Sequence, residues 1–65
     1  MNTKVLGSIQ EIEAERVKVN DEWIYFSFGA DDLKDFKRGD YVIITTYQAS
    51  DKVRGLNIGL WKHGR

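Results

Sequence analysis

The sequence predicts an all-β protein, a single small domain whose five short strands close into a barrel. Five segments alternate apolar and other side chains with the period of two that strands require. The one segment with helical spacing is too short to be stable alone. Five strands in a chain of 65 residues would expose too many edges in a flat sheet, and closure into a barrel removes those edges.

The first strand is expected at residues 4–12, with Val5, Gly7 and Ile9 on one face. Ile12 breaks the alternation, which indicates a bend or a bulge near the end of this strand. Glycine inside a strand is common where a barrel strand curves or where another backbone approaches closely. Gly7 therefore predicts one of these two features.

A β-hairpin is expected at residues 16–28, with its polar turn at residues 20–22, where Asn, Asp and Glu follow one another. A half-buried strand needs only one apolar face. The natural core side of the hairpin combines aliphatic residues with two phenylalanines: Val17, Val19, Ile24, Phe26 and Phe28.

The other face of the hairpin carries Trp23 and Tyr25 beside Lys18. Exposed aromatic and basic side chains on a sheet are typical of a surface that stacks bases. They are also typical of a protein–protein contact patch. A third interpretation is structural, because Trp23 lies at the start of its strand and can fold over the barrel rim to cover the core.

A short helix is expected between the third and fourth strands, near residues 31–37. Asp31 or Asp32 can cap its N-terminus, where carboxylates also meet the favourable end of the helix dipole. Leu33 and Phe36, three residues apart, lie on one side of such a helix. We expect this side to pack on the barrel as a plug.

The last two strands are expected at residues 41–47 and 52–61, and the first of these segments is rich in β-branched residues. In the last strand, alternate apolar residues share one face, namely Leu56, Ile58 and Leu60. The opposite, outward row is expected to hold Gly55, Asn57, Gly59 and Trp61. The two glycines either expose bare backbone to a ligand or allow the strand to coil tightly, and the second explanation is favoured.

This order of elements resembles the OB-fold, a five-stranded Greek-key barrel with a small helix between its third and fourth strands. The resemblance covers roughly residues 4–61 of a single domain at 1–65, and residues 62–65 form a basic tail. It depends on the element order, on Gly7 and on residues 33–42, which are similar to the helix, basic pair, Gly-Asp and strand junction common in such barrels. The paired aromatic signatures of cold-shock domains are absent, and an SH3-like barrel would not place its helix there.

The resemblance implies a binding surface on the outer faces of the second and third strands, flanked by the loops after strands one and four. The residues of this chain at those positions are Lys18, Trp23, Tyr25, Tyr47, Lys52 and Arg54. The expected ligand is single-stranded DNA or RNA, bound with weak sequence preference. Bases would stack on Trp23 and Tyr25, while Lys18, Lys52 and Arg54 would neutralise phosphates.

The alternative is a protein-interaction module or a small homo-oligomer that buries the same aromatic face in a partner. Asn57 and Trp61 are then possible interface residues, since aromatic side chains dominate interface energetics. Glu11, Glu13 and Glu15 favour this alternative, because a run of carboxylates beside the hairpin would repel phosphate. The simplest account of that run is a solvated acidic edge.

Charge does not decide between the two functions. The formal net charge is zero, with ten basic and ten acidic side chains. Residues 21–40 carry six acidic and three basic side chains, whereas residues 41–65 carry one acidic and four basic ones. A neutral protein can still present a locally positive groove, whose affinity for nucleic acid would depend steeply on salt.

Several classes of function are disfavoured. The chain has no cysteine, which excludes disulfides and thiolate metal sites and fits an intracellular, cytoplasmic protein. The single histidine, His63, gives no metal-ligand spacing, and no nucleophile elbow or phosphate loop occurs. No apolar run approaches the length of a membrane span, and no signal-peptide core follows the first residues. We therefore expect a binding protein with no cofactor, no metal and no membrane contact, and not an enzyme.

Overall fold

The computed structural model describes residues 2–27 and 30–61, and only the backbone of residues 30–32. Within these ranges the chain forms five strands and one 3₁₀ helix: β1 (Asn2–Ile12), β2 (Arg16–Val19), β3 (Glu22–Phe26), η1 (Ala30–Asp35), β4 (Tyr41–Gln48) and β5 (Val53–Leu60). The strands close into a barrel in the order β1-β2-β3-β5-β4. The pairing of β3 with β5 is parallel and the other four pairings are antiparallel.

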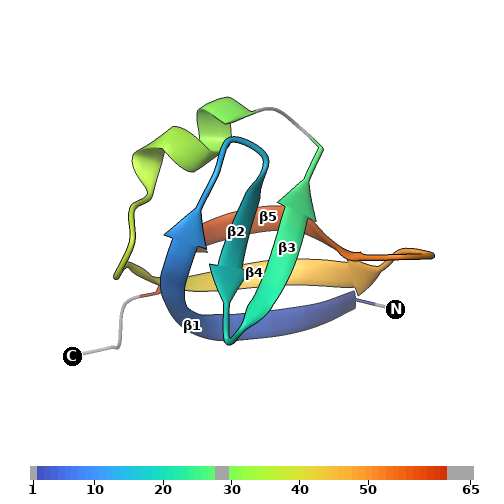
Figure 1. Cartoon of the computed structure of the whole chain (residues 1–65). Coiled ribbons are helices and arrows are strands. Elements are labelled where there is room, and N and C mark those ends of the chain that lie inside the picture. The colour runs from blue at the N-terminus through green and yellow to red at the C-terminus, as the bar shows by residue number, and fades with distance from the viewer. Residues whose placement is uncertain (1, 28–29, 62–65) are drawn as a thin grey trace.

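This architecture confirms the predicted all-β barrel and the short helix between the third and fourth strands, and it is consistent with an OB-like fold. Figure 1 shows the β2–β3 hairpin in front of β4 and β5, with β1 curving round to pair with both β2 and β4. No helix in the described part of the chain has the length and apolar character that a membrane span requires. Three predictions lie outside the described residues and side chains: the core position of Phe28, the capping by Asp31 or Asp32, and the basic tail at 62–65.

The inward faces of the strands and one residue of η1 form a single core: Ile9, Val17, Val19, Ile24, Phe26, Leu33, Val42 and Ile44. The core side predicted for the hairpin is therefore confirmed at its four described positions. Leu33 is only 3% exposed, and Phe36 packs beside it against the core. The helix is a plug, as expected, although it is a 3₁₀ helix that ends at Asp35.

Gly7 marks a close approach between β1 and the end of β2. A Cβ atom added to Gly7 would lie 2.6 Å from Asn20 Oδ1 and 2.8 Å from Val19 Cγ1. The pairing of β1 with β2 also shifts register between Ile9 and Glu11. Both irregularities predicted for the first strand are thus confirmed, and they allow β1 to bend around the barrel.

The hairpin turn is shorter than predicted. Val19 pairs with Glu22, so the turn consists of Asn20 and Asp21 alone, with φ angles of 55° and 65°. Asn and Asp tolerate this left-handed conformation, and two such residues give the hairpin turn that matches strand twist. The Gln10 side chain supports the turn, because its Oε1 accepts a 2.6 Å hydrogen bond from the Asp21 amide and its Nε2 donates a 3.0 Å bond to Asp21 Oδ1.

The alternation predicted for the last strand is wrong at a bulge. Thr45 pairs with Asn57 and Thr46 with Gly55, which leaves Leu56 as an extra residue on β5. The extra residue reverses the parity, so that Gly55 points inward and is buried, while Leu56 is 43% exposed. Gly55 is needed there because any Cβ at this position would overlap the ring of Phe26.

Beyond the bulge, Ile58 packs against the core as expected. Leu60 shares its parity and lies opposite Val42, yet it is 53% exposed at the end of the strand. Asn57, Gly59 and Trp61 keep the predicted outward parity. Of the four residues predicted to face outward, only Gly55 faces inward instead.

Candidate functional site

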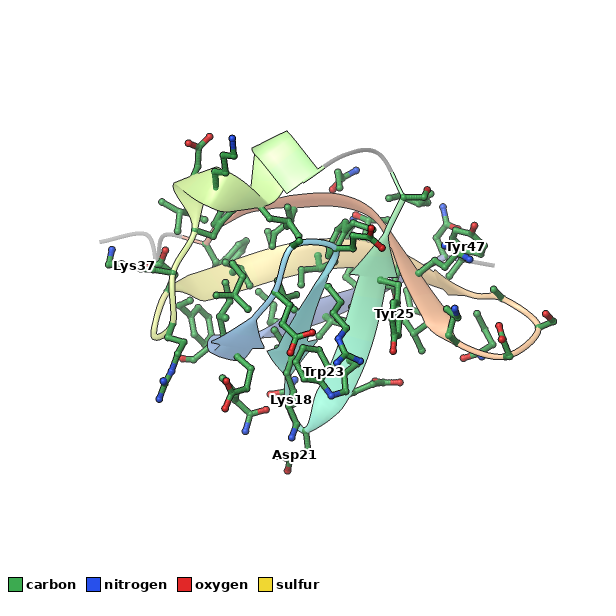
Figure 2. The ribbon with its side chains drawn as sticks, turned by 45° about the horizontal axis from the view of Figure 1, so that its top comes forward. Lys18, Asp21, Trp23, Tyr25, Lys37 and Tyr47 are labelled. Carbon is green, nitrogen blue, oxygen red and sulfur yellow. The ribbon has the colours of Figure 1, made fainter. Side chains whose placement is uncertain are left out.

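A row of alternating cations and aromatic rings crosses four neighbouring strands on the outside of the barrel. Arg16 on β2 lies opposite Tyr25 on β3, Tyr25 pairs with Arg54 on β5, and Arg54 pairs with Tyr47 on β4. Paired residues of neighbouring strands project to the same side of a sheet, so these four side chains lie in one line. Figure 2 shows Trp23 and Tyr25 on the hairpin and Tyr47 beyond them.

A second pair, Lys18 and Trp23, lies one step nearer the hairpin turn. Lys52 directly precedes β5 with the parity of Arg54, and its Nζ is 4.7 Å from the centroid of the Tyr25 ring. All of these side chains are half-buried. We call this surface the basic-aromatic face, and its members are Arg16, Lys18, Trp23, Tyr25, Tyr47, Lys52 and Arg54.

Arg16 contacts two aromatic rings of this face. Its Cζ lies 3.9 Å from the centroid of the Trp23 ring and 5.5 Å from that of Tyr25, within the range of cation–π attraction. Its Nη1 donates a 2.8 Å hydrogen bond to the Tyr25 hydroxyl, and its Nε donates a 2.7 Å hydrogen bond to Glu13 Oε1. Lys18 is less tightly held, with its Nζ 5.9 Å from the centroid of Trp23.

These contacts hold the Arg16 side chain in place. The hydrogen bond to Glu13 and then that to Tyr25 also raise the pKa of Arg16 above its ordinary value. Glu13 offsets part of the charge of Arg16. One member of the acidic run therefore orders the basic-aromatic face, in addition to forming a solvated edge.

The structure brings all six residues predicted for the binding site onto one face: Lys18, Trp23, Tyr25, Tyr47, Lys52 and Arg54. The prediction missed Arg16. The signal was present, because Arg16 and Lys18 are two residues apart on β2 and therefore share one face. The length of the turn decides only which residue of β3 lies opposite Arg16, and the two-residue turn makes it Tyr25.

The two predicted interface residues lie farther along the chain than the part of β5 that pairs with β3. Asn57 is exposed opposite Thr45. Trp61 follows β5, is 40% exposed, and donates its backbone N–H to the carbonyl of Tyr41 at 2.9 Å. Neither residue belongs to the basic-aromatic face.

An apolar surface lies on the outer faces of β1, β4 and β5. Leu6, Ile43 and Gly59 are directly paired across these three strands. Leu6 and Tyr41 are each 40% exposed, like Trp61. A Cβ added to Gly59 would meet nothing within 4 Å, so the surface is open at this position.

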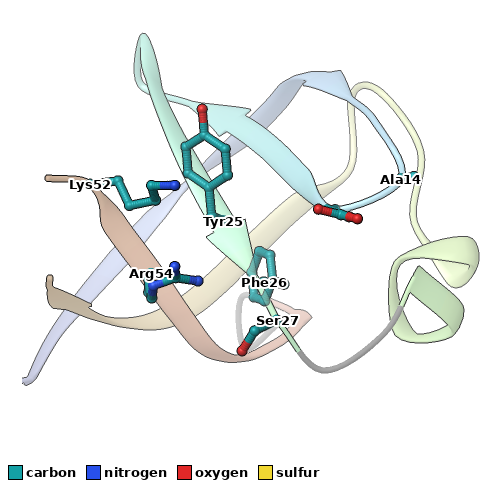
Figure 3. A pocket seen from close by; sticks show the side chains of 7 residues that line it. Ala14, Tyr25, Phe26, Ser27, Lys52 and Arg54 are labelled. Carbon is teal, nitrogen blue, oxygen red and sulfur yellow. The ribbon is translucent and has the colours of Figure 1, made fainter.

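A hollow of about 390 Å³ lies beside Tyr25 at the edge of the basic-aromatic face, lined by Ala14, Glu15, Tyr25, Phe26, Ser27, Lys52 and Arg54. Figure 3 shows Lys52 and Arg54 on one side of Tyr25 and Phe26, and Ala14 on the other. The Phe26 amide donates a 2.8 Å hydrogen bond to the Glu15 carbonyl, which holds the β1–β2 loop against β3. Within residues 2–27 and 30–61, neither Lys52 nor Arg54 has an ion-pair partner.

The arrangement is suited to binding. It presents aromatic planes, four cations and an open hollow, and no group of three His, Cys, Asp or Glu side chains that could hold a metal ion occurs in the part of the chain that is described. No family model matches the chain, and neither the curated proteins nor the solved structures gave a match. The closed barrel and its outer face are therefore the basis for inferring a function.

Proposed function

We propose that this protein binds single-stranded nucleic acid on its basic-aromatic face, with weak sequence preference. The observation that supports this most strongly is the alternation of Arg16, Tyr25, Arg54 and Tyr47 across four strands, with Lys18 and Trp23 beside it. Aromatic rings and guanidinium planes stack on any base, because every base has a π-face. Cations spaced between the rings suit the phosphates that separate successive bases.

The Arg16–Trp23 pair is the proposed centre of stacking. Since Arg16 already covers one face of the Trp23 ring at 3.9 Å, a base stacks either on the other face of the ring or on the outer side of the guanidinium. Both arrangements use the same pair. Loss of either partner should therefore weaken binding by removing a stacking surface.

Electrostatics should make this binding modest and sensitive to salt. The chain is neutral overall, and Glu13 already compensates Arg16, which leaves Lys18, Lys52 and Arg54 as phosphate partners. For a single strand each neutralised phosphate adds about −0.7 to the slope of log K against log salt concentration. We expect a slope of about −2.

Tryptophan fluorescence offers a direct test, because the chain has two tryptophans and Trp61 lies outside the proposed site. A Trp61→Phe variant leaves Trp23 as the only tryptophan and serves as the reference protein. Titration with a ten-nucleotide oligo-dT at low salt should quench its emission, and added salt should reverse the effect.

Replacement of the proposed stacking ring should weaken binding without unfolding the barrel. We expect Trp23→Ala to lose roughly 1–3 kcal/mol of binding free energy, measured by the fluorescence anisotropy of a labelled oligonucleotide. Absence of any binding at low salt, with oligo-dT and oligo-U alike, would refute the proposed function. So would a Trp23→Ala variant that binds as tightly as the native chain.

The apolar surface of β1, β4 and β5 favours a second candidate, self-association of the chain. Leu6, Ile43 and Gly59 form an uncharged line across three strands, and exposed Tyr41 and Trp61 flank it. An exposed apolar sheet face of this kind is typical of contacts between copies. Sedimentation over a hundredfold concentration range should then detect a dimer that Ile43→Lys abolishes, and a monomer at every concentration would exclude it.

A further inference from the structure

The hollow beside Tyr25 has chemically different ends. Glu15 lines it from the loop between β1 and β2, whereas Lys52 and Arg54 line it from the start of β5. Among residues 2–27 and 30–61, the exposed Glu15 carboxylate has neither a hydrogen-bond partner nor an ion-pair partner. A ligand that fits both ends carries negative charge at one end and N–H donors at the other.

The two ends of the hollow are far enough apart for a nucleotide. Glu15 lies just before β2, and β3 lies between β2 and β5, so the backbones at the two ends are two strand spacings apart, roughly 9–10 Å across the sheet. This is comparable to the span of a nucleotide from its phosphate to the Watson–Crick edge of its base. The Tyr25 ring between the two ends provides a stacking surface for that base.

Charge fixes the orientation of such a ligand. A phosphate is attracted by Lys52 and Arg54 and repelled by Glu15, so it belongs at the β5 end. The base edge then faces Glu15. An ionised carboxylate only accepts hydrogen bonds, so it selects a base edge that donates them.

We infer that this hollow recognises guanine, with Glu15 as the residue that determines specificity. Guanine alone among the common bases has two adjacent donors on its Watson–Crick edge, N1–H and N2–H₂, which match the two oxygens of a carboxylate. Adenine, cytosine, thymine and uracil each place an acceptor beside their donor, and that acceptor would face the carboxylate. The inference depends on the proposed function and adds one sequence-selective position to it.

A set of three oligonucleotides tests the inference on the full chain. The first is a nine-nucleotide oligo-dT, the second carries one central deoxyguanosine, and the third carries deoxyinosine there, which keeps N1–H and lacks the N2 amino group. We expect the guanine oligonucleotide to bind about tenfold more tightly than oligo-dT, with inosine between them. A single guanine in each strand prevents the assembly of guanine tetrads.

The Glu15→Gln variant separates recognition from general charge. It should bind guanine and thymine oligonucleotides within about twofold of each other, since a carboxamide offers one acceptor in place of two. It should also bind oligo-dT more tightly than the native chain, because a phosphate-repelling charge is gone. Glu11→Gln is the matched control, since Glu11 is an exposed carboxylate outside the hollow, and it should keep the preference for guanine.

Each outcome decides the inference. Guanine selectivity that disappears in Glu15→Gln and persists in Glu11→Gln supports it. Equal binding of guanine and thymine oligonucleotides by the native chain overturns the inference and leaves the proposed function standing. Selectivity that persists in Glu15→Gln also overturns it, because recognition then lies elsewhere, and a failure to bind any oligonucleotide overturns both.

Discussion

Two glycines on β5 provide a matched test of how the barrel closes beneath the basic-aromatic face. Gly55 is buried, and a Cβ there would overlap the ring of Phe26, which is itself only 3% exposed. Gly59 faces outward, and a Cβ there would meet nothing within 4 Å. The same substitution, glycine to alanine, therefore probes two opposite environments four residues apart.

The quantity to compare is the free energy of unfolding of Gly55→Ala and of Gly59→Ala. Alanine reduces the entropy of the unfolded chain equally at both positions, so this stabilising effect cancels when the variants are compared. The remainder is the overpacking at Gly55, where an added Cβ would overlap the buried Phe26 ring, and it should cost about 1–3 kcal/mol. Gly59→Ala alone should stabilise the fold by about 0.4–1 kcal/mol.

Urea unfolding followed by tryptophan fluorescence measures this difference, because both substitutions keep Trp23 and Trp61. A domain of this size loses about 1 kcal/mol of stability per molar urea, so the midpoints should differ by about 1–3 M. Equal midpoints, or a lower midpoint for Gly59→Ala, would refute the parallel β3–β5 contact that places Gly55 under Phe26 and thereby turns Tyr25 and Arg54 outward.

Two further comparisons probe the face and the plug. Arg16→Gln should weaken oligo-dT binding more than Lys18→Gln does, although each substitution removes one charge. The reason is that only Arg16 lies in close contact with both Trp23 and Tyr25. Titration at several salt concentrations should also show that Lys18→Gln reduces the magnitude of the salt slope by about 0.7. Equal losses would argue against a special role for Arg16. Leu33→Ala should destabilise the barrel by about 2–5 kcal/mol in urea, since the residue is 3% exposed in the core, whereas exposed Asp35→Ala in the same helix should change stability by less than about 0.5 kcal/mol.

Alternation along the strands was enough to predict the core side of the hairpin. The hairpin residues expected to face inward are buried at every described position, and Trp23 and Tyr25 project outward as expected. Gly7 also signalled a real close approach. These features are local, since each follows from the period of a strand or from the absence of a single side chain.

Features that depend on counting residues between strands were not predictable in the same way. Asn20, Asp21 and Glu22 are all polar, and only the left-handed backbone of the first two defines a two-residue turn. That count decides which residue of β3 lies opposite Arg16. The alternation places Arg16 on the same face as Lys18, but it cannot report that Tyr25 is the partner across the hairpin.

The bulge on β5 is a second example of this limit. One extra residue, Leu56, reverses the parity between the two ends of the strand, so a pattern extended along the whole strand misplaces Gly55. The reason that Gly55 must be glycine lies in Phe26, which is 29 positions away in the chain and adjacent through a parallel pairing. Such a contact follows only from the closed topology.

The proposal that single-stranded nucleic acid binds the basic-aromatic face is tested most directly by mapping the contact on the folded protein. Amide ¹⁵N–¹H spectra recorded during titration with a ten-nucleotide oligo-dT at low salt report every backbone position at once. We predict that the shifts concentrate on β2, β3 and the start of β5, at residues 16–18, 23–25 and 52–54, and that Trp61 and the Leu6–Ile43–Gly59 line stay unchanged. Shifts confined to that apolar line, or no shifts at all, would contradict the account.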